Sequence, residues 1–108
     1  MGRWVRVARR DEIPLDGGRA FEVDGLAIGV YRCGERMFAI GDVCSHAFAL
    51  LHEGSVDRVR CTVSCPLHGA EFDLASGEAL SPPAPEAVPV YAVRLAGDDV
   101  EVEVPGSG

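Results

Sequence analysis

The sequence contains no lysine and no long apolar run, and each shortage excludes a class of protein. All ten basic residues are arginines, and seventeen acidic residues leave a net charge of −7 over 108 residues. Binding to nucleic acid needs clustered positive charge, so we expect no nucleic-acid partner. The run AFALL, at residues 47–51, is far shorter than the roughly 20 apolar residues that span a bilayer, so we expect no membrane segment.

A secretory signal is also missing from the pattern. The segment MGRWVRVARRDEIP carries early arginines but lacks the apolar stretch of a signal peptide, which predicts the reducing cytoplasm. In that compartment, four cysteines favour metal ligands or buried thiols over disulfides. These cysteines are Cys33, Cys44, Cys61 and Cys65.

No segment keeps a helical period over three turns, although RRDEIP at residues 9–14 is long enough for one helical turn. Instead, short segments alternate apolar and polar residues between turns rich in glycine, proline and aspartate. Such segments predict an all-β antiparallel sandwich or barrel. The alternating segments are RWVRVA, LAIGVY, RVRCTV and DVEVEV.

The region 42–85 differs from the rest of the chain. It holds three of the four cysteines, all three histidines and four of the seven prolines, and its strand pattern is the least regular. We therefore expect a single domain over 1–104, in which the two ends form a β scaffold and about 42–85 form a small inserted subdomain. Residues 105–108 are expected to be a flexible tail.

Two Cys/His pairs in this region form the strongest motif. Cys44-x-His46 is followed, after 18 residues, by Cys65-x-x-His68. Each pair places two metal-binding side chains on one tight loop, and the intervening strands are long enough to bring the loops together. The spacing predicts a metal site formed by these four residues.

The other cysteines and the third histidine favour structural interpretations. Cys33 lies beside a turn, and His52 is expected to be a surface or capped residue. Alternation places Cys61 with Val59 and Val63 on one buried strand face. Because Cys61 and Cys65 would lie roughly 13 Å apart along that strand, we expect them neither to share an iron nor to form a disulfide.

Two thiolates and two imidazoles suit either zinc or an iron–sulfur centre. A structural Cys₂His₂ zinc finger usually separates its cysteines from its histidines, on a hairpin and a helix. Here each pair mixes the two types, which suits a two-iron cluster with two cysteines on one iron and two histidines on the other. That is the ligand set of a Rieske [2Fe–2S] centre.

At these residues the sequence resembles the Rieske-type ferredoxins of bacterial aromatic-ring-hydroxylating dioxygenase systems. CSHAFALLHEG and CPLHGAEFDLASGEAL are similar to the two cluster loops of that family. The resemblance covers most of the chain, and it implies two antiparallel sheets with a cluster-binding subdomain inserted. Three further stretches share it: MFAIGDVCSH before the first loop, SPPAP as a third loop over the cluster, and VYAVRLAGDDVEVEV as the closing hairpin.

The resemblance also implies a role for each ligand. Cys44 and Cys65 would bind the buried iron, and His46 and His68 would bind the outer iron through Nδ1, with Nε2 toward solvent. In the second loop, Pro66 would stiffen the chain and Gly69 would supply an open backbone conformation. The gap between the pairs is about one residue longer than in most relatives, and we place the extra residue within VDRVRCTVS.

High-potential members of the same family have a disulfide between the cluster loops and a serine hydroxyl near a bridging sulfur. The matching positions here hold Phe48 or Ala49, Leu67 and Ala70, none of which supplies those groups. Fewer hydrogen bonds to sulfur predict a midpoint potential near the low end of the Rieske range, about −150 mV. Reduction adds negative charge beside the histidines, so we also expect the potential to fall at alkaline pH.

No nucleophile–base pair is evident, so the predicted function is electron transfer and not catalysis. The resemblance implies a cytoplasmic, monomeric carrier of single electrons from an NAD(P)H-dependent reductase to a terminal Rieske oxygenase. Docking would be transient, near His46 and His68, beside the apolar Phe48 and Leu67. The alternatives are a small subunit of nitrite reductase or of another oxidoreductase complex, and a structural zinc module. The sequence does not select the oxygenase, the reductase or the final substrate.

Overall fold

The computed structural model describes residues 2–44, 49–67, 69–80 and 86–105. Its strands form three antiparallel sheets, as the alternating segments predict, and the all-β fold class is confirmed. The strands are β1 (Gly2–Arg9), β2 (Gly17–Val23), β3 (Leu26–Cys33), β4 (Arg36–Gly41), β5 (Val56–Asp57), β6 (Thr62–Ser64), β7 (Glu71–Asp73), β8 (Val90–Tyr91), β9 (Val93–Ala96) and β10 (Asp99–Pro105).

Helical structure is confined, in the described ranges, to two three-residue 3₁₀ turns. The turn η1 (Arg10–Glu12) confirms the single helical turn expected in RRDEIP, and η2 (Leu51–Glu53) follows the first Cys/His pair. Neither is long or apolar enough to cross a membrane, and the same holds for every helix among the residues described.

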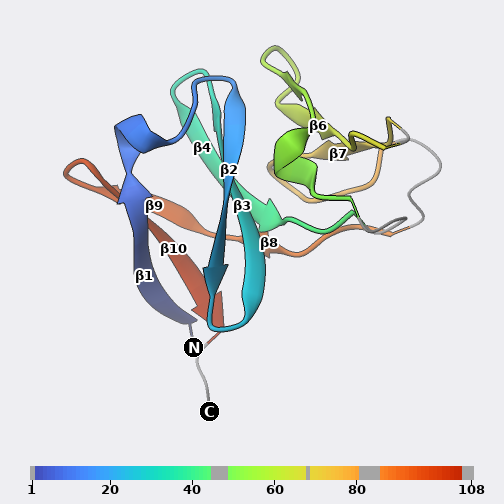
Figure 1. The fold of residues 1–108 in the computed structure, drawn as a ribbon. Coiled ribbons are helices and arrows are strands. Elements are labelled where there is room, and N and C mark those ends of the chain that lie inside the picture. The colour runs from blue at the N-terminus through green and yellow to red at the C-terminus, as the bar shows by residue number, and fades with distance from the viewer. Residues whose placement is uncertain (1, 45–48, 68, 81–85, 106–108) are drawn as a thin grey trace.

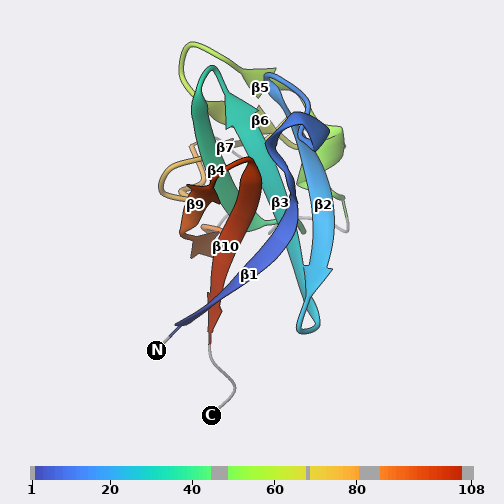
Figure 2. The ribbon, with the colours of Figure 1, turned by 90° about the vertical axis from the view of Figure 1, so that its left-hand side faces the viewer.

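The three sheets lie in layers (Figures 1 and 2). One outer sheet has the strand order β1-β10-β9 and the central sheet has the order β2-β3-β4-β8; together we call them the scaffold. The third sheet, β5-β6-β7, which we call the small sheet, lies on the far side of the central sheet. Its strands span residues 56–73, within the region that the cysteines and histidines marked.

Both faces of the central sheet are buried, each against a different sheet. Successive strand residues point to opposite faces, so one strand can contribute to the packing on both. In β3, Ile28 and Val30 pack into a core shared with the outer sheet, whereas Tyr31 and Cys33 pack into a second core. We call this second core, which lies against the small sheet, the loop-side core. Its buried members are Tyr31, Cys33, Ile40, Cys44, Ala49, Leu51, Cys61, Val63, Cys65, Ala70, Phe72, Leu74 and Val88.

The closing hairpin shows the alternation most clearly. Val100, Val102 and Val104 of β10 are buried, and the residues between them are not. Strand β10 includes Pro105, which pairs with Gly2 of β1, so the ladder extends one residue into the predicted tail. The rest of that tail, residues 106–108, lies outside the described ranges.

The prediction of a strand throughout RVRCTV is wrong in its first half. Residues 58–61 form a turn, Val59 is 88% exposed, and β6 begins only at Thr62. The Asp57 carboxylate accepts hydrogen bonds from the backbone N–H groups of Val59 and Arg60, at 2.9 and 3.1 Å. A side chain that binds the backbone locally competes with strand pairing, which explains the turn.

Candidate metal centre

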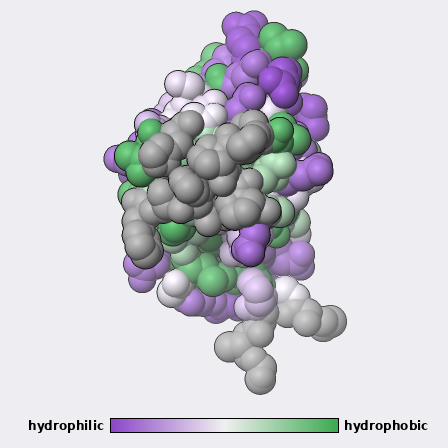
Figure 3. Space-filling view, turned by 90° about the vertical axis from the view of Figure 1, so that its right-hand side faces the viewer, coloured by the Kyte–Doolittle hydropathy of each residue, from purple (hydrophilic) through white to green (hydrophobic). Residues whose placement is uncertain are grey.

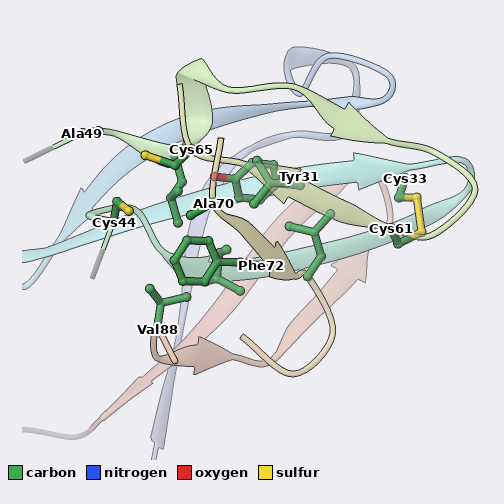
Figure 4. Packing of buried hydrophobic residues seen from close by; sticks show 13 residues of the cluster. Tyr31, Cys33, Cys44, Ala49, Cys61, Cys65, Ala70, Phe72 and Val88 are labelled. Carbon is green, nitrogen blue, oxygen red and sulfur yellow. A yellow bond between two sulfur atoms is a disulfide. The ribbon is translucent and has the colours of Figure 1, made fainter. Parts of the chain in front are cut away.

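Cys44 and Cys65 occupy corresponding places at the ends of strands from different sheets. Cys44 follows β4 of the central sheet, and Cys65 follows directly after β6 of the small sheet. Their exposed fractions are 3% and 2%, and both belong to the loop-side core. Packing of the small sheet against the central sheet therefore brings the two thiols to the same end of this core (Figure 4).

A matching hydrogen bond closes the base of each loop. The backbone N–H of Cys44 donates to the carbonyl of Ala49 at 2.9 Å, and that of Cys65 donates to the carbonyl of Ala70 at 2.7 Å. Each bond spans the same number of residues, with 45–48 in the first loop and 66–69 in the second. The two loops thus have the same closure, with a buried cysteine and a buried alanine at each base.

The second loop turns sharply at Gly69. Its φ is +74°, and its N–H donates to the carbonyl of Cys65 at 2.9 Å. A positive φ is a conformation that glycine adopts without strain, so the predicted open backbone at this residue is confirmed. Leu67, in the same loop, is 59% exposed.

The two predicted histidine ligands lie outside the described residues, as does Phe48 of the expected docking patch. The same is true of the SPPAP segment, residues 81–85. Within the described ranges, no group of three or more histidine, cysteine or acidic side chains could hold a metal ion. The structure therefore shows the cysteine half of the motif.

A buried acid behind the first loop was not anticipated from the sequence. Asp42, two residues before Cys44, is almost fully buried, and its carboxylate binds His52 twice. It accepts the His52 backbone N–H at 2.8 Å and lies 2.6 Å from the imidazole Nδ1. The carbonyl of Asp42 also accepts the Leu51 N–H at 2.7 Å.

This pair ties η2 to the end of β4 and so fixes the start and return of the first loop. His52 is thus a partly buried partner of Asp42 and not simply a surface residue. The sequence signal for it was an aspartate directly after an apolar strand, followed ten residues later by a histidine.

Tyr31 lies on the same side of the central sheet as Asp42. Gly18 and Gly29 leave room for it, since a Cβ at those positions would lie 2.4 Å from the Tyr31 ring and 2.8 Å from its hydroxyl. The hydroxyl is buried and lies beside the Asp42 carboxylate. Burial raises the pKa of the Tyr31 phenol above its usual range, and the negative charge of Asp42 raises this pKa further.

The two cysteines outside the motif form a disulfide. Cys33 and Cys61 are both buried, as expected, but they are bonded to each other, with Cα atoms 5.7 Å apart. The prediction of two separate buried cysteines, one of them on a regular strand, is therefore wrong. Alternation predicts a strand through residues 58–61, whereas the chain turns there and Cys61 has φ +52°. The sequence pattern therefore does not place Cys61 beside Cys33.

The donor set suits a cluster that has one buried, thiolate-bound iron. Soft thiolates bind iron–sulfur clusters, and apolar surroundings with few sulfur hydrogen bonds lower their reduction potential. Cys44 and Cys65 are the thiols that the disulfide leaves unbridged, and both lie at loop bases in an apolar core. The bonded Cys33 and Cys61 are unavailable as ligands, which excludes a cluster bound by all four cysteines.

Comparison with known proteins agrees with this geometry. A model of the Rieske-like [2Fe–2S] domain matches residues 3–103. The anthranilate 1,2-dioxygenase ferredoxin subunit of Burkholderia cepacia is 36% identical over 104 residues, which cover 96% of this chain and 94% of that protein.

Solved structures give the same result. The ferredoxin of carbazole 1,9a-dioxygenase from Nocardioides aromaticivorans IC177 superposes with a TM-score of 0.88 at 35% identity, over 92% of this chain and 95% of that chain. A second match is a chain in the complex of reduced oxygenase and oxidized ferredoxin in carbazole 1,9a-dioxygenase. It superposes with a TM-score of 0.83 at 29% identity. That match covers 92% of this chain and 91% of that chain.

The chain belongs to the family of Rieske-like [2Fe–2S] domains. Within that family it is a ferredoxin of the kind found in aromatic-ring dioxygenase systems, an electron carrier and not an enzyme, and its cofactor is one Rieske-type [2Fe–2S] cluster. The zinc alternative is thereby set aside. A putative nitrite reductase small subunit from Mycobacterium tuberculosis also superposes, over 99% of each chain with a TM-score of 0.88, but at 24% identity this likeness shows the fold alone.

Proposed function

We propose that Cys44 and Cys65 bind one iron of the cluster and that His46 and His68 bind the other. The observation that carries this proposal is the pair of matched loop bases, each with a buried cysteine whose backbone N–H closes the loop. The bound cluster would supply one-electron redox chemistry, and the chain would supply two loop bases closed by hydrogen bonds and an apolar core around the cysteines. The proposed domain comprises residues 1–104, with about 42–85 as the cluster-binding subdomain.

In the proposed pathway, one electron comes from an NAD(P)H-dependent reductase and leaves to the Rieske centre of a terminal oxygenase. The carbazole 1,9a-dioxygenase complex, in which a ferredoxin is bound to its oxygenase, supports an oxygenase as the partner. We propose that this carrier acts in the cytoplasm. We propose that it acts as a monomer, because a carrier must release each partner in turn.

The surface around the loops suits brief docking. Leu67 is exposed at the tip of the second loop, and Val43 and Leu50, which form an isolated β-bridge, are exposed beside the first. Figure 3 shows hydrophobic surface bordering the grey residues at this end of the molecule. A small apolar patch gives a weak, exchangeable interface, as electron-transfer partners need.

Electron paramagnetic resonance of the dithionite-reduced protein tests the ligand set. We expect the low average g-value that mixed histidine and cysteine ligation produces. Cys44→Ser and Cys65→Ser should each abolish the signal, because a lost thiolate leaves the buried iron without its ligand. His46→Asn and His68→Asn should abolish it or replace it with a different signal.

Matched control variants are available for both residue types. His52→Asn changes the one histidine outside the motif, and Cys33→Ser changes a cysteine in the disulfide. Freshly assembled, both should keep the Rieske signal. If His52→Asn lost the signal while His46→Asn kept it, the proposed ligand set would be wrong.

A further inference from the structure

The Cys33–Cys61 disulfide connects the scaffold to the small sheet. Cys33 is the last residue of β3 in the central sheet, and Cys61 ends the turn that leads into β6. Figure 4 shows the bond at the opposite end of the loop-side core from Cys44 and Cys65. The disulfide is therefore separate from the proposed ligands and joins two units that are otherwise held together by packing and hydrogen bonds.

Cys61 is linked mechanically to Cys65 by a short, well-paired strand. Only β6, Thr62–Ser64, lies between them, and this strand pairs with β5 on one side and β7 on the other. The carbonyl of Cys61 also accepts the Leu74 N–H at 3.0 Å. A strand paired on both sides moves as a unit, so anchoring at Cys61 restrains the position of Cys65.

The anchored residue, Cys61, has a strained backbone at the end of an exposed turn. Cys61 has φ +52°, a left-handed conformation that is unfavourable for a residue with a side chain. Apart from the disulfide, its backbone is held by its N–H bond to the Asp57 carbonyl, at 2.8 Å, and by the bond from Leu74. Residues 57–60 are all exposed. An exposed turn opens more readily than a core strand does.

Opening of the turn would admit a reductant. A thiolate of a dithiol attacks one sulfur, forms a mixed disulfide and releases the other cysteine. The second thiol of the reductant then displaces the protein sulfur. Two electrons and two protons pass to Cys33 and Cys61, and the reductant leaves as its own disulfide. Cytoplasmic dithiol reductants are the chemical class that supplies this step.

We propose that Cys33 and Cys61 form a reversible thiol–disulfide site that anchors the strand before Cys65 and so prolongs the lifetime of the cluster. In the disulfide state the small sheet is tied to the scaffold. In the dithiol state the cluster is lost faster, and the carrier is inactivated when the cell is strongly reducing. The inference rests on the proposed binding of iron by Cys65.

Thiol counting in the intact holoprotein tests the first part. Air-oxidised protein is denatured in iodoacetamide and analysed by mass spectrometry, and a second sample is first reduced with dithiothreitol while folded. We expect two alkylated cysteines in the first sample and four in the second. Four in the first sample, or two in the second, would overturn the proposal.

Cluster lifetime tests the second part. Loss of visible absorbance is followed in the presence of a chelator, with and without dithiothreitol. We expect the reductant to accelerate the loss of the cluster about tenfold. This factor corresponds to only part of the stabilisation expected from a disulfide that closes a loop with a sequence separation of 28. The double variant Cys33→Ser/Cys61→Ser should lose its cluster at the fast rate under both conditions, which controls for attack of the reductant on the cluster itself.

An unchanged rate in reduced wild-type protein would overturn the proposal even if the double variant failed to fold. The resonance signal of the wild-type protein separates failure of the anchoring role from failure of the proposed function. If a Rieske signal is present and the rate does not respond, only the anchoring role fails. If no Rieske signal is present, the proposed function fails, and thiol counting still decides whether the disulfide exists.

Discussion

At the scale of single residues, the surroundings of Cys44 and Cys65, the proposed cluster ligands, are apolar. Ala70 is fully buried, and its carbonyl accepts the Cys65 N–H. The family resemblance matches Ala70 to the serine of high-potential members. Because a hydroxyl beside a bridging sulfur stabilises the reduced cluster, a side chain with no hydroxyl favours a low potential. The predicted value of about −150 mV is consistent with these surroundings and stays a prediction.

Ala70→Ser should therefore raise the midpoint potential by on the order of tens of millivolts. Protein-film voltammetry or a dye-mediated titration measures it directly. Ala39→Ser is the matched control, because Ala39 is equally buried but belongs to the scaffold core on the other face of the central sheet. Equal shifts in both variants would show that the hydroxyl acts through general stability and not through the cluster.

Tyr31 gives a prediction about alkaline stability. Its pKa is raised by burial, so the unfolded chain ionises first, near pH 10, while the folded protein keeps the proton. The stabilisation is complete below pH 10 and is lost as the pH rises above it. The free energy of unfolding should fall by about 1.4 kcal/mol between pH 8 and pH 11 from this residue alone.

Urea unfolding of wild type and Tyr31→Phe across this range isolates that contribution. Phenylalanine cannot ionise, and it keeps the buried aromatic ring. The variant should therefore lose less stability at high pH than the wild type does. Tyr91, whose pKa is also raised by burial, is common to both proteins and cancels. Parallel pH profiles for the two proteins would contradict the prediction.

At the scale of elements, the proposed metal centre lies on two loops that follow strands of different sheets and have the same closure. Strand β4 ends at the first loop and β6 at the second, and each loop base is closed by a cysteine N–H bonded to an alanine carbonyl. The sequence predicted the two loops from their Cys/His spacing. It could not predict the closing bonds, because those depend on the backbone path between residues and not on residue type.

Gly69 and Gly25 allow a test of the second loop as an element. Both have positive φ, +74° and +80°, and a Cβ at either would meet no atom within 4 Å. Alanine at each position should cost about 1 kcal/mol of unfolding free energy, from backbone strain alone. Only Gly69→Ala should also change the midpoint potential or the resonance line positions, because Gly25 lies in the β2–β3 turn of the scaffold. A spectrum of Gly69→Ala identical to that of wild type would show that the loop tolerates the change.

At the scale of the whole molecule, the central sheet contributes side chains to both cores. Its strands place Ile28 and Val30 toward the outer sheet and Tyr31 and Cys33 toward the small sheet. Three layers therefore share two cores, and the cluster end is separated from the chain termini by the width of the scaffold (Figure 1). Antiparallel pairing of β1 with β10 holds the two ends of the described chain together.

Sequence and tertiary structure determined different parts of this description. Period-two alternation identified the all-β class, and the spacing of Cys44, His46, Cys65 and His68 identified the kind of metal centre, because both signals are local. Contacts between distant residues were decided only by folding: the buried Asp42–His52 pair and the Cys33–Cys61 disulfide. The turn at residues 58–61 shows the physical reason. The Asp57 side chain binds backbone N–H groups that a strand would have used, and this local competition redirects the chain so that Cys61 meets Cys33.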